Sequence, residues 1–147
     1  MWPGVMRFRG VYGEVLTTPE GVGAACWLAP GKTRMRLWRM LRAGSGLMRT
    51  VMQLPSEDWK RFFEVMQPID RMHRRLIPEP HWYLWTLGVA PESEGQGVDG
   101  ALLVPILERA DKERVPCYLE TETEENVAFY GRRGFEVVEG SRSSKAV

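Results

Sequence analysis

Apolar residues predominate in two short stretches near the N-terminus, 11–17 and 22–28. Short apolar runs bounded by turn residues are typical of β-strands. The intervening Thr18-Pro19-Glu20-Gly21 is a turn signal. This pattern predicts two antiparallel strands joined as a hairpin.

Two later segments repeat apolar residues at helical spacing. The first covers about 34–43. The second begins at Ser56, an N-cap residue type followed by two acidic residues, and stops at Pro78. Its apolar positions, interpreted as core, are Trp59, Phe62, Phe63, Met66, Ile69, Met72 and Leu76.

Strands and helices alternate in the second half of the chain. Aromatic and β-branched residues predict a strand over 82–89, and shorter strands are expected at 116–120 and 135–138. Helices are expected up to about 114 and over 126–132. The buried stripe of the first is Ala101, Leu102, Ile106, Leu107 and Ala110. Two strands joined by a helix imply a parallel pair with a right-handed connection, so we expect an α/β fold.

The composition is that of an ordinary globular protein, with 147 residues, 44% hydrophobic and 27% charged. We expect one domain over 1–147. No apolar run approaches the roughly 20 residues of a membrane span, and the N-terminus lacks a signal-peptide core. We therefore expect a cytoplasmic protein without a membrane partner. Cys26 and Cys117 suit buried thiols better than a disulfide framework.

Charge is unevenly distributed. Residues 1–80 hold 13 Lys/Arg and 7 Asp/Glu, giving +6, whereas residues 81–147 hold 7 and 12, giving −5. The basic residues between 32 and 42 alternate with apolar ones, which favours the solvated face of an amphipathic helix over a nucleic-acid patch. We expect no nucleic-acid partner.

The segment 87–103, LGVAPESEGQGVDGALL, reads as a strand, a turn, a glycine-spaced loop and a helix. Backbone N–H groups at a helix N-terminus can bind phosphate. Gly95, Gly97 and Gly100 spell G-x-G-x-x-G, and Glu120 follows 20 residues later, as in a dinucleotide-binding fingerprint. Residues 90–94 separate the strand from the first glycine, however, and this loop is too long for that fingerprint. An NAD-dependent oxidoreductase is therefore the third hypothesis.

The same segment resembles the acetyl-CoA-binding motif of GNAT superfamily N-acetyltransferases. There, a strand ending in L-G/A-V precedes a glycine loop and a helix opening with A-L-L. The downstream ETETEENVAFYGRRGFEVV resembles the second family signature, carried by Asn126, Phe129, Tyr130, Gly134 and Phe135. The resemblance covers about 12–139 and is strongest from His81 onward. It implies a mixed, mostly antiparallel central sheet with one splayed parallel strand pair and helices on both faces.

By resemblance, the protein transfers acetyl from acetyl-CoA to a primary amine on a small molecule or peptide. The amine attacks directly in a ternary complex, and no metal is expected. The pantetheine arm would insert beside the strand before the loop, where the Val89 N–H would polarise the thioester carbonyl. The implied cosubstrate-binding residues are Leu87, Gly88, Val89, Glu94, Gly95, Gln96, Gly97, Val98, Asp99, Gly100, Asn126, Phe129 and Tyr130.

Acid and base candidates follow from the same resemblance. Tyr130 would protonate the departing thiolate, because phenols and thiols have comparable pKa values. Glu120 and Glu122 lie near the expected place for the base, with a surface or capping role as the alternative for each. His73 and His81 are interpreted as structural.

Two carboxylates depart from the family pattern. Glu94 replaces the usual Gln or Arg, and Asp99 replaces Gly or Ala. At ~4 Å, two like charges repel by about 1 kcal/mol in water and about 4 kcal/mol at an effective dielectric of 20. Asp99 either faces the phosphates or points outward, where it would favour the helix dipole. The second functional hypothesis is therefore a non-catalytic interaction module that binds acetyl-CoA weakly or not at all.

Both ends of the chain are expected to lack family elements. Only a short basic segment precedes Val11, and no strand is expected after Glu139 to pair with 135–138. Missing edge strands would leave backbone groups unpaired. Either the protein is a shortened family member, or a partner chain such as a second copy covers those edges.

Overall fold

The computed structural model describes residues 4–33, 56–139 and 142–145. The helix expected over 34–43 lies outside these residues. The chain divides into two compact units, which we describe separately: 1–33 with 79–147, and 34–78.

In the second unit, helix α3 spans Ser56–Leu76, as the sequence predicts. Glu57 and Asp58 lie in its first turn, and His73, Arg74 and Arg75 in its last. Both groups have the sign that stabilises the helix dipole. None of the described helices is long and apolar enough to span a bilayer.

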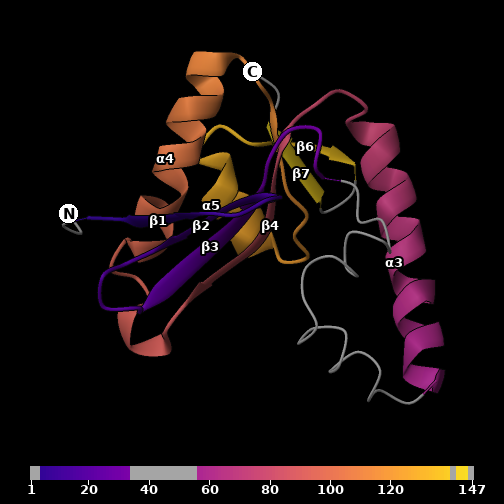
Figure 1. The fold of residues 1–147 in the computed structure, drawn as a ribbon, viewed down its shortest axis with the longest axis horizontal. Coiled ribbons are helices and arrows are strands. Elements are labelled where there is room, and N and C mark those ends of the chain that lie inside the picture. The colour runs from indigo at the N-terminus through magenta and orange to yellow at the C-terminus, as the bar shows by residue number, and fades with distance from the viewer. Residues whose placement is uncertain (1–3, 34–55, 140–141, 146–147) are drawn as a thin grey trace. The chain divides into compact units, whose positions relative to one another are not determined.

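The first unit contains a seven-stranded sheet in the order β1-β2-β3-β4-β5-β7-β6 (Figure 1). Only β4 and β5 pair in parallel, and the other neighbours are antiparallel. The expected mixed, mostly antiparallel sheet with one parallel pair is confirmed. The strands are β1 Met6–Arg9, β2 Gly13–Thr17, β3 Gly23–Leu28, β4 Trp82–Val89, β5 Cys117–Tyr118, β6 Glu136–Glu139 and β7 Arg142–Lys145.

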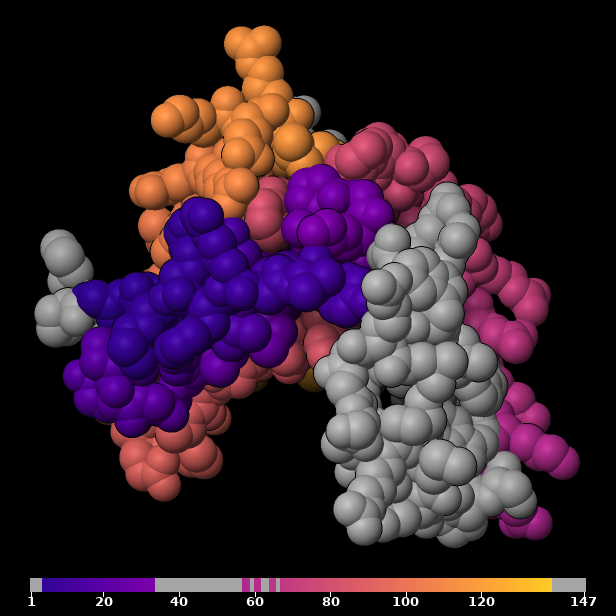
Figure 2. Space-filling model, viewed as in Figure 1, coloured from indigo at the N-terminus to yellow at the C-terminus, as the bar shows by residue number. Residues whose placement is uncertain are grey.

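The expectation that both end strands are missing is wrong. Strand β1 pairs with β2, and β7 lies between β5 and β6. Both escape sequence reasoning for physical reasons. All four residues of β1 are exposed, and the N-terminal region forms the indigo part of the surface in Figure 2. Strand β7 has the polar sequence RSSK, which has no hydrophobic alternation. The case for a homodimer that rested on the missing strands falls with this correction.

Helix α4, Val98–Glu113, packs against β3 and β4 and supplies much of the core. Helix α5, Glu124–Gly131, contributes Tyr130 to the same cluster. The buried residues of α4 are Val98, Leu102, Leu103, Ile106, Leu107 and Ala110. Four of these belong to the apolar stripe that the sequence predicts.

Gly23 allows α4 to approach β3 closely. A Cβ atom at this position would lie 2.8 Å from Val98 Cγ1 and 3.0 Å from Leu102 Cδ1. We expect Gly23→Ala to lower the free energy of unfolding by about 1–2 kcal/mol through overpacking, measured by urea denaturation. Gly88→Ala is the matched control, because a Cβ at Gly88 meets nothing within 4 Å. Equal losses in the two variants would show that steric overlap with α4 is not the cause.

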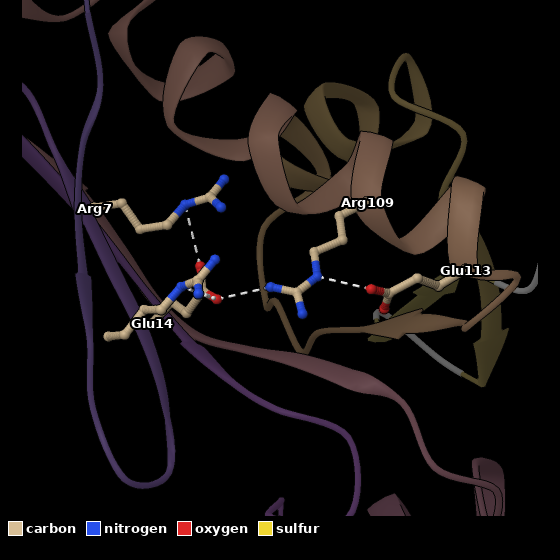
Figure 3. Close-up of polar contacts among 5 residues, drawn as sticks. Arg7, Glu14, Arg109 and Glu113 are labelled. Carbon is tan, nitrogen blue, oxygen red and sulfur yellow. Dashed lines mark hydrogen bonds and ion pairs between the residues drawn. The ribbon is translucent and has the colours of Figure 1, made fainter.

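A buried carboxylate links the N-terminal strands to α4 (Figure 3). Glu14 on β2 is 6% exposed, and three arginines surround it. The nitrogen–oxygen distances are 2.9 Å from Arg109 Nη1, 3.2 Å from Arg7 Nε and 3.5 Å from Arg9 Nε. Arg109 also pairs with Glu113 at 2.9 Å and lies over the Trp82 ring. The cluster therefore joins β1, β2 and α4 through one residue.

Candidate functional site

Strand β4 is paired along only part of one side. Strand β5 pairs with it through Trp82↔Cys117 and Tyr83↔Tyr118, whereas β4 continues to Val89. Among the strands that the structure describes, none pairs with residues 84–89 on this side. We call this stretch the open edge of β4.

A β-bulge determines which peptide groups face the open edge. On β3, Cys26 lies opposite Thr86 and Trp27 opposite Leu84, so Trp85 is the extra residue. Beyond the bulge, Ala90 N donates to Val22 O at 2.7 Å. Since hydrogen-bonding direction alternates along an antiparallel strand, the N–H and C=O groups of Leu87 and Val89 point away from β3. Both residues therefore present main-chain groups at the open edge.

The open edge leads directly into the glycine loop. A short 3₁₀ turn, η1 Pro91–Ser93, is followed by Gly95 and Gly97 with φ of 72° and 80°. These left-handed values explain why glycine is needed at both positions. Gly97 is the N-cap of α4 and has no side chain to bond the N–H groups of the first turn. Glu94 and Gln96 are exposed, and Val98 is buried against Gly23.

Asp99 folds back onto the helix that contains it. Its Oδ1 accepts a hydrogen bond from Gly100 N at 2.7 Å. The carboxylate is therefore at the first turn of α4, among the N–H groups expected to bind phosphate, and does not extend away from the helix. Its negative charge also helps to raise the pKa of Tyr130, so it acts on that residue across the site.

Arg133 places a positive charge against the same turn, which the sequence analysis missed. Its guanidinium lies 3.7 Å from the centre of the Phe129 ring, and Nη1 donates to Phe129 O at 2.8 Å. A Cβ at Gly100 would lie 2.6 Å from Arg133 Nη2, so Gly100 makes room for this side chain. The adjacent arginines in the GRRGF run are the only sequence signal, and they do not show which one turns inward.

Tyr130 is 9% exposed and packs edge-on against Phe129 and Phe135. Burial raises its pKa, as does the Asp99 charge, while Arg133 opposes the shift. The phenol is therefore protonated at neutral pH, as a proton donor must be. Asn126 lies in the first turn of α5 with its side chain exposed, and its N–H donates to the capping Thr123 Oγ1.

Glu120 lies two residues beyond β5, beside the start of the open edge. Its carboxylate accepts hydrogen bonds from the phenols of Tyr83 and Tyr118. Glu122 is exposed. Of the two sequence candidates for a base, Glu120 is the one that the structure brings against the parallel strand pair.

The histidine and cysteine nearest the strand pair are buried. His81 is 3% exposed, its Nδ1 lies 2.7 Å from Glu79 O, and burial lowers its pKa. Cys117 is buried in the core, and burial raises the pKa of the Cys26 thiol. Within the described ranges, no three His, Cys, Asp or Glu side chains converge as metal ligands.

Comparison with known proteins gives consistent results. Residues 56–135 match the acetyltransferase (GNAT) family. The chain is 33% identical over 131 residues to an uncharacterized N-acetyltransferase of Schizosaccharomyces pombe, covering 85% of this chain. The match covers 51% of that relative, so the chain spans about half its length.

Two solved structures show weaker similarity. One is described as histone acetyltransferase HPA2 and related acetyltransferase from Corynebacterium glutamicum, with a TM-score of 0.47 and 24% identity over 91% of this chain and 62% of that one. The other is AtaT complexed with acetyl-methionyl-tRNAfMet, with a TM-score of 0.45 and 16% identity over 90% and 68%.

The family match includes β4, the glycine loop, α4, β5 and α5. The glycine loop thus lies inside the region that matches the acetyltransferase family. The sequence resemblance from His81 onward and the family match agree on the same elements, and we conclude that the chain belongs to the GNAT acetyltransferase family.

Proposed function

We propose that this protein is an acetyl-CoA-dependent N-acetyltransferase whose acceptor is a primary amine. The observation that carries the proposal is the continuity of the open edge of β4 with the glycine loop at the start of α4. A thin, extended cosubstrate with a pyrophosphate at one end suits this arrangement. Peptide groups are available along the edge, and N–H groups lie at the helix N-terminus.

The proposed binding mode uses mainly backbone groups. The outward N–H and C=O groups of Leu87 and Val89 would bond the pantetheine arm, with the Asn126 side chain as a further contact. The N–H groups of 95–100 would hold the pyrophosphate. The Arg133 guanidinium, which lies against Gly100, offsets part of the Asp99 charge at this turn.

The proposed chemistry is direct acyl transfer. The neutral amine attacks the thioester carbonyl, and the Val89 N–H stabilises the developing oxyanion. The amine proton passes to the Glu120 carboxylate, and the C–S bond breaks as Tyr130 donates its proton to the thiolate. Raising the pKa of Tyr130 above that of an ordinary tyrosine keeps it protonated for this step.

Calorimetry tests the proposed function directly. We expect acetyl-CoA to bind with a Kd of about 10 μM, equivalent to about −7 kcal/mol, and NAD to give no heat. Absence of acetyl-CoA binding at millimolar concentration would refute the proposal and favour the interaction module. Tight NAD binding would refute the assignment of the glycine loop.

Asp99→Asn tests the charge at the phosphate end. The amide oxygen can still accept from Gly100 N, but the negative charge is removed. We expect the Kd for acetyl-CoA to fall about tenfold, because like charges near 4 Å repel by about 1 to 4 kcal/mol. The gain should shrink at high salt.

Glu108→Gln is the control, since Glu108 is an exposed acidic residue in the body of the same helix. It should leave the Kd within about twofold, because surface charges beyond a Debye length of about 10 Å are screened. An unchanged Kd in Asp99→Asn would mean that the carboxylate does not face the phosphates.

A further inference from the structure

A carboxylate is held between two tyrosines where β4 and β5 separate. Glu120 Oε1 accepts from the Tyr118 hydroxyl at 3.1 Å, and Oε2 accepts from the Tyr83 hydroxyl at 3.3 Å. Tyr83 and Tyr118 are directly opposite each other in the register, with ring centres 5.8 Å apart. Each carboxylate oxygen is therefore fixed by a donor from a different strand.

The surrounding packing makes this arrangement rigid. Tyr118 is fully buried, and the buried His81 ring packs edge-on against it at 6.0 Å. His81 is itself held by its contact with the Glu79 carbonyl. The Tyr118 hydroxyl thus has little freedom to leave the carboxylate.

The Glu120 carboxylate lies close to the point where the open edge of β4 begins. Trp82, Leu84, Cys117 and Leu119 belong to the core cluster under α4. Since side chains alternate along strands, Tyr83, Tyr118 and Glu120 lie on the opposite face. Tyr83↔Tyr118 is also the last pair of the two strands, so the open edge begins immediately beyond it.

We propose that Tyr83 and Tyr118 are positioning residues that hold Glu120 as the base for the acceptor amine. This inference rests on the proposed function and adds two residues that orient Glu120, the general base of the proposed reaction. As the N–C bond forms and the C–S bond breaks, the amine proton moves to a Glu120 oxygen, and Tyr130 supplies the thiolate proton. Glu120 then returns its proton to water, and the Tyr130 phenolate takes a proton from water, which regenerates both residues.

Two phenols suit this role for stereochemical and electrostatic reasons. Hydrogen bonds to a carboxylate favour its charged form, which is the form that accepts a proton. A shift of about 1 Å in a reacting group can lower the rate about 100-fold, so fixing both oxygens has a large effect on rate.

The test measures CoA release from acetyl-CoA with spermidine and with Nα-acetyl-lysine amide as acceptors. We expect Tyr83→Phe and Tyr118→Phe each to lower kcat about tenfold, and Glu120→Gln about 100-fold. The Kd for acetyl-CoA should stay within about twofold in all three. Tyr12→Phe and Glu125→Gln make the same chemical changes at residues that do not belong to the Tyr83–Glu120–Tyr118 group. Both control variants should retain wild-type rates.

A double variant separates positioning from general structural support. If the Tyr118 phenol acts through Glu120, Tyr118→Phe/Glu120→Gln should be as active as Glu120→Gln alone, because the two effects are coupled. A further tenfold loss in the double variant, or wild-type rates in both tyrosine variants, would overturn the inference.

The two proposals fail in different ways. A wild-type protein that does not bind acetyl-CoA refutes the proposed function. A wild-type protein that binds acetyl-CoA but releases no CoA with either amine refutes the assignment of Glu120 and its tyrosines, while cosubstrate binding stands.

Discussion

Replacing Tyr130 with phenylalanine is expected to lower kcat about 100-fold, while the Kd for acetyl-CoA stays within about twofold. The substitution removes only the hydroxyl, so the edge-on contacts with Phe129 and Phe135 are retained. Steady-state kinetics with spermidine, together with calorimetry, would separate the two quantities. Tyr12→Phe makes the same chemical change outside the proposed site and should leave kcat unchanged.

The pH profile gives this prediction a second readout. Proton donation needs the neutral phenol, so activity is lost as pH rises through the pKa of Tyr130. Because burial and Asp99 raise that pKa, the alkaline limb due to Tyr130 should lie above the ordinary tyrosine value of about 10. Tyr130→Phe should lack this limb. Wild-type turnover in Tyr130→Phe would exclude the residue as the acid.

Glu14→Gln is expected to lower the free energy of unfolding by about 2–3 kcal/mol, measured by urea denaturation. Removing one partner of a buried ion pair typically costs about 3–5 kcal/mol. The effect should be smaller here because the side chains of Arg7 and Arg109 are 33% and 37% exposed, which lets water screen the guanidinium groups once the Glu14 charge is removed.

Glu113→Gln provides the comparison within the same cluster. Its carboxylate also pairs with Arg109 at 2.9 Å, but its side chain is 43% exposed. We expect a loss of at most about 0.5 kcal/mol, which should diminish with added salt. If both variants lost the same free energy of unfolding, the burial of Glu14 would not explain its contribution to stability.

The sequence predicted best those elements whose signals are local and strong. The dense run of aromatic and β-branched residues predicted β4 with its observed bounds, and the apolar stripe after the glycines predicted the buried face of α4. In both elements, periodicity and burial act together. Strand β7 is polar, so its composition does not predict a strand. It is defined instead by its pairing with β5 and β6.

The residues of the candidate site likewise separate into those with a local sequence signal and those without one. The glycine loop and Tyr130 could be identified from motifs, because their spacing along the chain is itself the signal. The bonds of Glu120 to Tyr83 cross 37 residues of sequence, and those of Glu14 to Arg109 cross 95. Such contacts depend on strand register and on helix docking, which no local pattern encodes. Arg133 was missed for the same reason.

The β-bulge at Trp85 has a consequence for how this protein tolerates change. The groups offered at the open edge belong to the peptide backbone, so most side-chain replacements at 87 and 89 would preserve them. If Trp85 were paired in register instead of bulged, regular alternation would turn Thr86 and Gly88 to the edge. Alanine scanning would therefore report this stretch as permissive, although a one-residue register shift beyond Leu84 would be highly damaging. The binding information resides in the register of the strand.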